Sequence, residues 1–209
     1  MHRLPVLALV ALLSACGQQE PAAPAPEPTP TASPALTPDP AEEAAVARTG
    51  ELVRSLGGTL KSNLLAAMKE KGPAGAASFC SLEAQGLTAG LNSDTERVGR
   101  SSLKLRNPKN AGPDWVTAWL TEQGERPLEG VKGFTRTETR EDGTRVARTI
   151  KPLGVDGPCL TCHGPAESLP PDVASLLSEK YPDDAATGYA LGALRGVMWA
   201  EVAYEPTPR

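Results

Sequence analysis

Leucines recur at four-residue intervals in the first regular hydrophobic pattern of the chain. This spacing places them on one face of an amphipathic helix, which we predict over residues 41–71. The Gly72-Pro73 pair removes a helical hydrogen bond and ends this helix. The pattern therefore predicts a helix with one buried stripe, which consists of Leu52, Leu56, Leu60 and Leu64.

A second helix is predicted from Pro73 to about Leu91. Its apolar residues again fall three or four positions apart, so they share one face. Cys80 lies on this stripe, and we expect its thiol to point toward the interior. The stripe is formed by Ala76, Cys80, Ala84, Leu87 and Leu91.

The rest of the chain alternates between short helical and strand-like segments. Residues 131–139 and 144–151 are β-prone and flank a turn with Gly143, which indicates a hairpin. Residues 194–204 read as a last strand, and residues 170–180 as a helix. A short helix is also predicted to open at Pro113-Asp114 and to pack its Trp115 and Trp119, four residues apart. Helices around a small antiparallel sheet make an α+β domain.

The N-terminus has the pattern of an export signal. An apolar run at 4–13 follows a basic start, and it is about half of the roughly 20 residues that a membrane-spanning helix needs. The sequence Leu13-Ser14-Ala15-Cys16 resembles the lipobox of bacterial lipoproteins. We therefore expect a signal peptide over residues 1–15 and lipidation of Cys16, which would anchor the chain to a membrane on the periplasmic side. Gly17, rather than Asp, follows this cysteine, which resembles enteric lipoproteins of the outer membrane and weakly favours that membrane.

Residues 16–40 are rich in Pro and Ala and contain no aromatic residue, so they cannot bury a core. We interpret them as a disordered tether that holds the folded domain, residues 41–209, away from the membrane. The net charge of −4 and the 22% of charged residues do not favour a nucleic-acid partner or a polytopic membrane protein.

Cys159-Leu160-Thr161-Cys162-His163 is a C-x-x-C-H pentapeptide, which is typical of c-type haem attachment. Two thiols at this spacing can bond the two vinyl groups of one porphyrin edge, and the adjacent imidazole then reaches the iron. Cys159 and Cys162 are thus the predicted attachment residues and His163 the predicted axial ligand of one covalent haem c. A Cys159–Cys162 disulfide or a zinc site that includes Cys80 are the alternatives.

The residue types alone allow several sixth ligands of the iron. The sequence has only two histidines, and His2 lies in the predicted signal peptide. The candidates are Cys80, Met68, Met198, a lysine, or an open position for water or a small gas. Each of the methionines and Cys80 can equally be a packed core residue.

Four segments of the chain carry a resemblance to known proteins: residues 72–80, 98–108, 159–164 and 181–188. Together they resemble one family, a c-type haem domain with a PAS-like fold, long described as a domain of unknown function. It occurs in free-standing exported cytochromes and as the extracytoplasmic module of some membrane sensor kinases. The resemblance covers about residues 45–204. It implies a PAS-like α+β fold with N-terminal helices, and it implies that Cys80 is the axial partner of His163. Two positions depart from the family pattern, at Glu83-Ala84 and at Val116.

Basic residues are concentrated between residues 97 and 109, which is either a solvated loop or a propionate-binding segment. In the second interpretation Arg100 and Arg106 pair with the haem propionates, because guanidinium groups match carboxylates. The favoured function is a membrane-tethered extracytoplasmic monohaem cytochrome that exchanges single electrons with unknown redox partner proteins, at low potential if Cys80 is a ligand. The alternative is a haem-based redox or gas (CO/NO) sensor. An enzyme is not favoured, because the mature chain lacks a second histidine for acid/base chemistry.

Overall fold

A computed structural model describes residues 39–208 of the chain. The predicted signal peptide, the lipidation site Cys16 and nearly all of the tether lie outside the described residues. No helix in the described part is long and apolar enough to cross a membrane.

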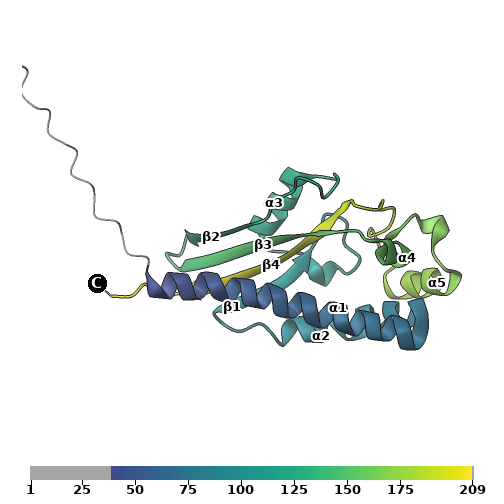
Figure 1. Cartoon of the computed structure of the whole chain (residues 1–209), viewed down its shortest axis with the longest axis horizontal. Coiled ribbons are helices and arrows are strands. Elements are labelled where there is room, and N and C mark those ends of the chain that lie inside the picture. Colours follow the sequence, from purple (N-terminus) through teal and green to yellow (C-terminus); the bar gives the residue numbers. More distant parts are fainter. Residues whose placement is uncertain (1–38, 209) are drawn as a thin grey trace, which may run out of the picture. The chain divides into compact units, whose positions relative to one another are not determined.

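A long kinked helix, α1 (Pro40–Leu82), runs along the sheet (Figure 1). Its kink lies at Gly72, which has a φ of 68° and precedes Pro73, so the two predicted helices are the two arms of α1. The prediction that the second arm continues to Leu91 was wrong. The chain leaves the helix at Glu83, and a separate short helix, α2 (Ala84–Ala89), follows.

The sheet has four antiparallel strands in the order β1-β4-β3-β2. They are β1 (Glu96–Ser101), β2 (Phe134–Thr139), β3 (Arg145–Gly154) and β4 (Leu194–Tyr204). The predicted hairpin is β2–β3, and the predicted last strand is β4. The α+β class with N-terminal helices beside an antiparallel sheet is confirmed.

Strand β1 was not predicted, because its sequence shows no alternation of apolar and polar residues. Arg97, Gly99 and Arg100 made this stretch look like part of a basic loop. In the structure it pairs along its whole length with β4, so that Arg100 stands opposite Met198. The hydrogen bonds to an apolar neighbour, and not its own side chains, make this segment a strand.

Each face of the sheet carries its own apolar cluster. On one face the leucine stripe of α1 packs against β1, β3 and β4, and Leu52 and Leu56 are almost completely buried. On the other face Val116 and Leu120 of α3 (Asp114–Gln123) pack against Trp199. Trp115 and Trp119 join this second cluster, which agrees with their predicted packing role.

The remaining helices gather at the kinked end of α1 (Figure 1). A 3-10 turn (Gly157–Cys159) leads into the short helix α4 (Leu160–His163), and α5 (Pro171–Lys180) follows. Val173 and Leu177 of α5 pack with Ala77 of α1, and Cys162 packs against this group. The C-x-x-C-H pentapeptide is therefore positioned by the second arm of α1.

Candidate functional site

The two cysteines and the histidine of the pentapeptide occupy one compact turn. Cys159 ends the 3-10 turn, where its backbone N–H donates to Asp156 at 2.9 Å, and Cys162 and His163 lie in α4. All three side chains are partly buried. Cys159, Cys162 and also Cys80 are free thiols. Within the described residues no cluster of three or more His, Cys, Asp or Glu side chains could hold a metal ion by itself.

His163 is oriented by a loop that precedes β4. Its Nδ1 lies 2.8 Å from the backbone oxygen of Ala186. Because a carbonyl oxygen can only accept, Nδ1 donates the proton and Nε2 is left with a free lone pair. Two backbone bonds fasten the same loop to α4, from Tyr189 N–H to the His163 oxygen (3.0 Å) and from Gly188 N–H to the Gly164 oxygen (2.8 Å).

The environment of His163 keeps its ring neutral. Burial, and then the positive charges of Arg195, Arg106 and Arg100, lower the pKa of His163 to about 3, although its bond to Ala186 acts in the opposite direction. A neutral imidazole with a fixed tautomer is the form that binds a metal. This geometry fits the axial-ligand role predicted for His163.

Arg106 holds the loop and α4 together. Its Nε donates to Asp184 at 2.9 Å, and its Nη2 donates to the backbone oxygen of Cys162 and, more weakly at 3.4 Å, to that of Ala186. Asp184 in turn accepts the Ala186 N–H at 2.8 Å. The side chains of Arg106 and Asp184 are only 11% and 12% exposed. Arg106 therefore fixes both the acceptor that orients His163 and the turn that carries Cys162.

Cys80 lies on the second arm of α1, half-buried against the apolar cluster that includes Phe79 and Ala84, as are Leu64 and Leu153. Burial raises the pKa of the Cys80 thiol, while the charges of Arg100 and Arg106 lower it. The Cys80 thiol also acts on the pKa of Cys162, which is raised mainly by burial. The structure therefore brings Cys80 into the same region as the pentapeptide.

Arg100 extends from β1 into this region without a partner. Among the described residues it has neither a hydrogen bond nor an ion pair, and burial lowers the pKa of its guanidinium, with the Cys80 thiol and Tyr181 acting in the opposite direction. Its free donors suit an anionic group. The two arginines predicted to bind propionates thus differ, because Arg106 already uses its Nε and Nη2 within the protein.

The two methionine candidates for the sixth position lie differently. Met198 is buried between β4 and α1, and its sulfur is so close to Gly57 that a Cβ there would lie 3.1 Å from it. This contact supports the packing interpretation of Met198. Met68 is partly buried on α1.

Sequence reasoning missed Arg195 and Tyr189. Arg195 is in β4, where its guanidinium lies 5.0 Å from the centre of the Tyr189 ring, and this ring stands edge-on to His163 at 6.4 Å. The available signal was a charged residue in a largely apolar strand, a pattern that Glu201 shares. Nothing in the sequence distinguished the two, because the partners of Arg195 come from other parts of the chain.

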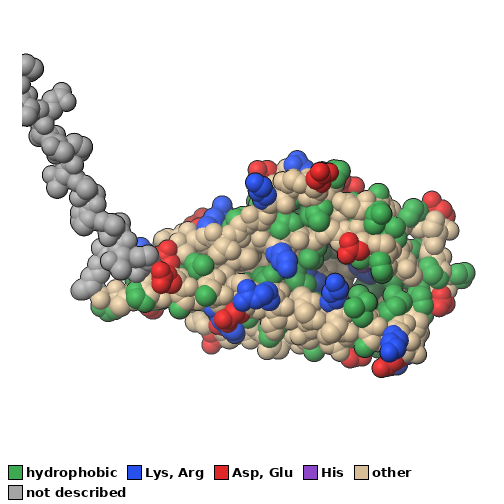
Figure 2. All heavy atoms as spheres, viewed as in Figure 1, with side chains coloured by type: hydrophobic (Ala, Val, Ile, Leu, Met, Phe, Trp, Pro, Cys, Tyr) green, Lys and Arg blue, Asp and Glu red, His purple; other side chains and the backbone are tan. Residues whose placement is uncertain are grey.

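Figure 2 shows a recess in the face that it draws, with Lys or Arg side chains and an Asp or Glu side chain at its border.

Comparison with known proteins gives one family and one solved structure. The model of the Tll0287-like family matches residues 39–202. No curated protein matches the chain. A solved structure, described as the crystal structure of the cyanobacterial heme-protein Tll0287, is 23% identical, covers 82% of this chain and 99% of its own, and superposes with a TM-score of 0.49.

Proposed function

Because the chain belongs to the Tll0287-like family, we propose that it is a monohaem c-type cytochrome that exchanges single electrons outside the cytoplasm. Cys159 and Cys162 attach one haem through their sulfur atoms, and His163 binds its iron. The observation that carries this proposal is the state of His163, a neutral, partly buried ring whose Nδ1 donates to Ala186 and whose Nε2 is free.

The residues of the site fit a haem. The attaching thiols are free and share one turn. Leu64 and Leu153 are half-buried against the same apolar cluster as Cys80, and Arg100 offers unpaired donors for a propionate. When bound, the haem supplies a one-electron couple at its iron. The backbone oxygen of Ala186 holds the proton on Nδ1 of His163. Arg106 ties the loop of Ala186 to α4, because it donates to the backbone oxygens of both Ala186 and Cys162.

Cys80 is the proposed second axial ligand. The resemblance found in the sequence implies it, and the position of Cys80 near Cys162 and Arg100 supports it. A thiolate donates electron density strongly to iron and stabilises the oxidised form, so this ligand predicts a low midpoint potential. Arg100 and Arg106, both within electrostatic reach of the thiol, favour its deprotonated form.

The decisive experiment compares UV-visible and EPR spectra of the ferric and dithionite-reduced protein with those of two variants. Cys80→Ala removes the proposed ligand, and Ser81→Ala changes the next residue of the same helix as a matched control. A low-spin thiolate-type signal present in the wild type and in S81A but absent in C80A supports the His163/Cys80 pair. A spectrum that is indifferent to Cys80 refutes this pair and returns the choice to Met198, Met68 or an open position.

Covalent attachment is tested separately. Replacement of Cys159 and Cys162 by alanine should abolish the haem stain that remains with the polypeptide after denaturing electrophoresis. Retention of the stain in the double variant would refute a c-type linkage at these residues.

The membrane tether is an independent part of the proposal. It rests on the lipobox-like sequence that ends at Cys16 and on the Pro-rich segment that follows. A lipid on Cys16 would hold the carrier at the periplasmic face, with the outer membrane weakly favoured. Cys16→Ser should release the protein into the soluble fraction, and unchanged fractionation would refute the anchor.

A second candidate function is the sensing of redox state or of a small gas. The observation that favours it is the burial of Cys80, which raises the pKa of its thiol and so disfavours the thiolate form. A thiolate ligand that is lost on reduction would open a position for CO or NO. This function predicts a spectral change when CO is added to the reduced protein, and a reduced protein that stays six-coordinate and ignores CO would exclude it.

A further inference from the structure

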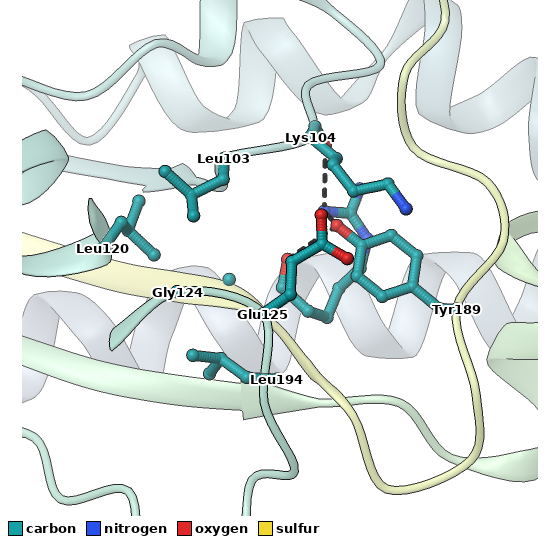
Figure 3. Close-up of a pocket in the computed structure, with 9 residues that line it drawn as sticks. Leu103, Lys104, Leu120, Gly124, Glu125, Tyr189 and Leu194 are labelled. Carbon is teal, nitrogen blue, oxygen red and sulfur yellow. Dashed lines mark hydrogen bonds between the residues drawn. The ribbon is translucent and has the colours of Figure 1, made fainter. Parts of the chain in front are cut away.

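A shallow pocket opens beside β4, next to the residues that orient His163. Lys104, Glu125 and Tyr189 reach it from three separate loops, and Figure 3 shows their side chains around it. Arg195 of β4 lines the same pocket. None of these four residues is assigned a role in the proposed electron transfer.

Two cations share one aromatic ring in this pocket. Lys104 Nζ lies 4.5 Å from the centre of the Tyr189 ring, and the Arg195 guanidinium lies 5.0 Å from it. The ring itself is buried, being only 8% exposed. In the described part of the chain neither cation forms an ion pair, although Glu125 lines the pocket and is exposed. Two like charges beside one ring repel each other, so an anion close to both of them would be stabilised.

The donors of Arg195 are only partly used. Its Nη1 donates to Ser102 Oγ at 2.7 Å and, more weakly, to the backbone oxygen of Lys104 at 3.4 Å and the Tyr189 hydroxyl at 3.5 Å. Its Nε is buried and has no partner. A buried donor without an acceptor is costly, and guanidinium donors match a carboxylate in geometry.

The pocket is coupled to His163 through Tyr189. The Tyr189 ring stands edge-on to the imidazole at 6.4 Å, and its backbone N–H donates to the His163 oxygen at 3.0 Å. Among the neighbouring charges, that of Arg195 also has the largest effect on the pKa of His163. A negative charge bound at Arg195 therefore changes the electrostatic environment of the proposed axial ligand.

We propose that Lys104 and Arg195 form a binding site for a carboxylate group against Tyr189. A carboxylate bound there changes the electrostatic environment of His163. The carboxylate has two sources, a propionate of the haem itself or a small free carboxylate such as formate. The binding site rests on the pocket alone, whereas its effect on the midpoint potential rests on the proposed haem function.

The first arm of the test needs no haem. Melting temperatures are measured at rising sodium formate, at constant ionic strength maintained with sodium chloride, for the wild type, Arg195→Gln, Lys104→Gln and the control Lys132→Gln, which removes an exposed charge elsewhere. A ligand that binds the native state raises the melting temperature. A free-carboxylate site predicts a saturable rise in the wild type and K132Q that is lost in R195Q and K104Q. Glu125→Gln should lower the formate concentration needed, because it removes a competing carboxylate.

The second arm detects the haem's own carboxylate. The propionate deformation bands in the resonance Raman spectrum and the midpoint potential are compared between wild type, R195Q, K104Q and K132Q. If a propionate occupies the site, formate has no effect, and the bands shift in R195Q and K104Q but not in K132Q. If the site is instead empty without formate, formate binding should lower the midpoint potential of the wild type by up to 59 mV. This shift corresponds to a tenfold change in the equilibrium constant of a one-electron couple.

The outcomes separate the two proposals. Absence of a formate response, together with unchanged propionate bands in both R195Q and K104Q, overturns the carboxylate site. Haem content, measured as the pyridine haemochrome, tests the proposed function by itself. A haem-free protein would refute the cytochrome, and the formate response alone would then decide whether the carboxylate site exists. Because Lys104 is at the edge of the pocket, K104Q keeps the test valid if R195Q fails to fold.

Discussion

Removal of Arg106 should destabilise the protein by leaving the Asp184 carboxylate without its partner. The two side chains are 11% and 12% exposed and their Nε and Oδ2 atoms are 2.9 Å apart. Breaking such a pair by removal of one partner costs about 3–5 kcal/mol, because the remaining charge stays buried. Since each group keeps some contact with water, we expect Arg106→Gln to lower the free energy of unfolding by about 3 kcal/mol.

A double-mutant cycle separates the ion pair from the other bonds of Arg106. Asp184→Asn should also destabilise the protein, since it leaves the guanidinium without its carboxylate and weakens the bond to Ala186 N–H. The double variant R106Q/D184N contains no unpaired charge. We therefore expect it to be more stable than the sum of the single effects predicts, by at least about 1 kcal/mol.

Urea unfolding followed by far-UV circular dichroism measures these differences at pH 7. Arg136→Gln is the matched control, because Arg136 is exposed (55%), its partner Glu138 is partly exposed (27%) and keeps Arg148 as a second partner, and such a pair contributes about 0–1 kcal/mol. If R106Q costs no more than R136Q, or if the R106Q and D184N effects simply add, the stabilising role of the buried Arg106–Asp184 ion pair is refuted.

Three further predictions concern the core and the surface. Leu56 is completely buried in the stripe of α1, so Leu56→Ala should lower the free energy of unfolding by about 2–5 kcal/mol in urea titrations, and a loss below about 1 kcal/mol would contradict its place in the core. A Cβ at Gly99 would lie 2.7 Å from the Trp199 ring, so Gly99→Val should cost about 1–3 kcal/mol and lower the melting temperature, whereas an unchanged melting temperature would show that the ring is free to move. The Arg48 hydrogen bond lowers the pKa of Glu96 from its usual 4.5, so this group stabilises the fold above pH 4.5 and loses that contribution as the pH falls through the lowered pKa. The pair is partly exposed, so Glu96→Gln should cost about 0.2–1 kcal/mol at pH 7 and less at pH 2, and an equal cost at both pH values would refute the ionic contribution.

The sequence determined the local features of this protein. The C-x-x-C-H pentapeptide carries its chemistry in five adjacent residues, because a short turn fixes the spacing of the two thiols and the imidazole. The leucine stripe and the β2–β3 hairpin also depend on contacts near in the sequence, and both are found in the structure. The family membership follows from similar segments spread over most of the chain.

Only the tertiary structure decided which residues surround His163. Its acceptor Ala186 lies 23 positions away, and the salt-bridge partner of Arg106 lies 78 positions away. No periodicity signals such pairs, since they depend on how a loop folds back over α4. Arg195 acquires its place beside Tyr189 in the same way, because the pairing of β4 with β1 and the path of the preceding loop set its neighbours. Local spacing determines which chemical groups a segment presents. Long-range packing determines the charges and hydrogen bonds that surround those groups.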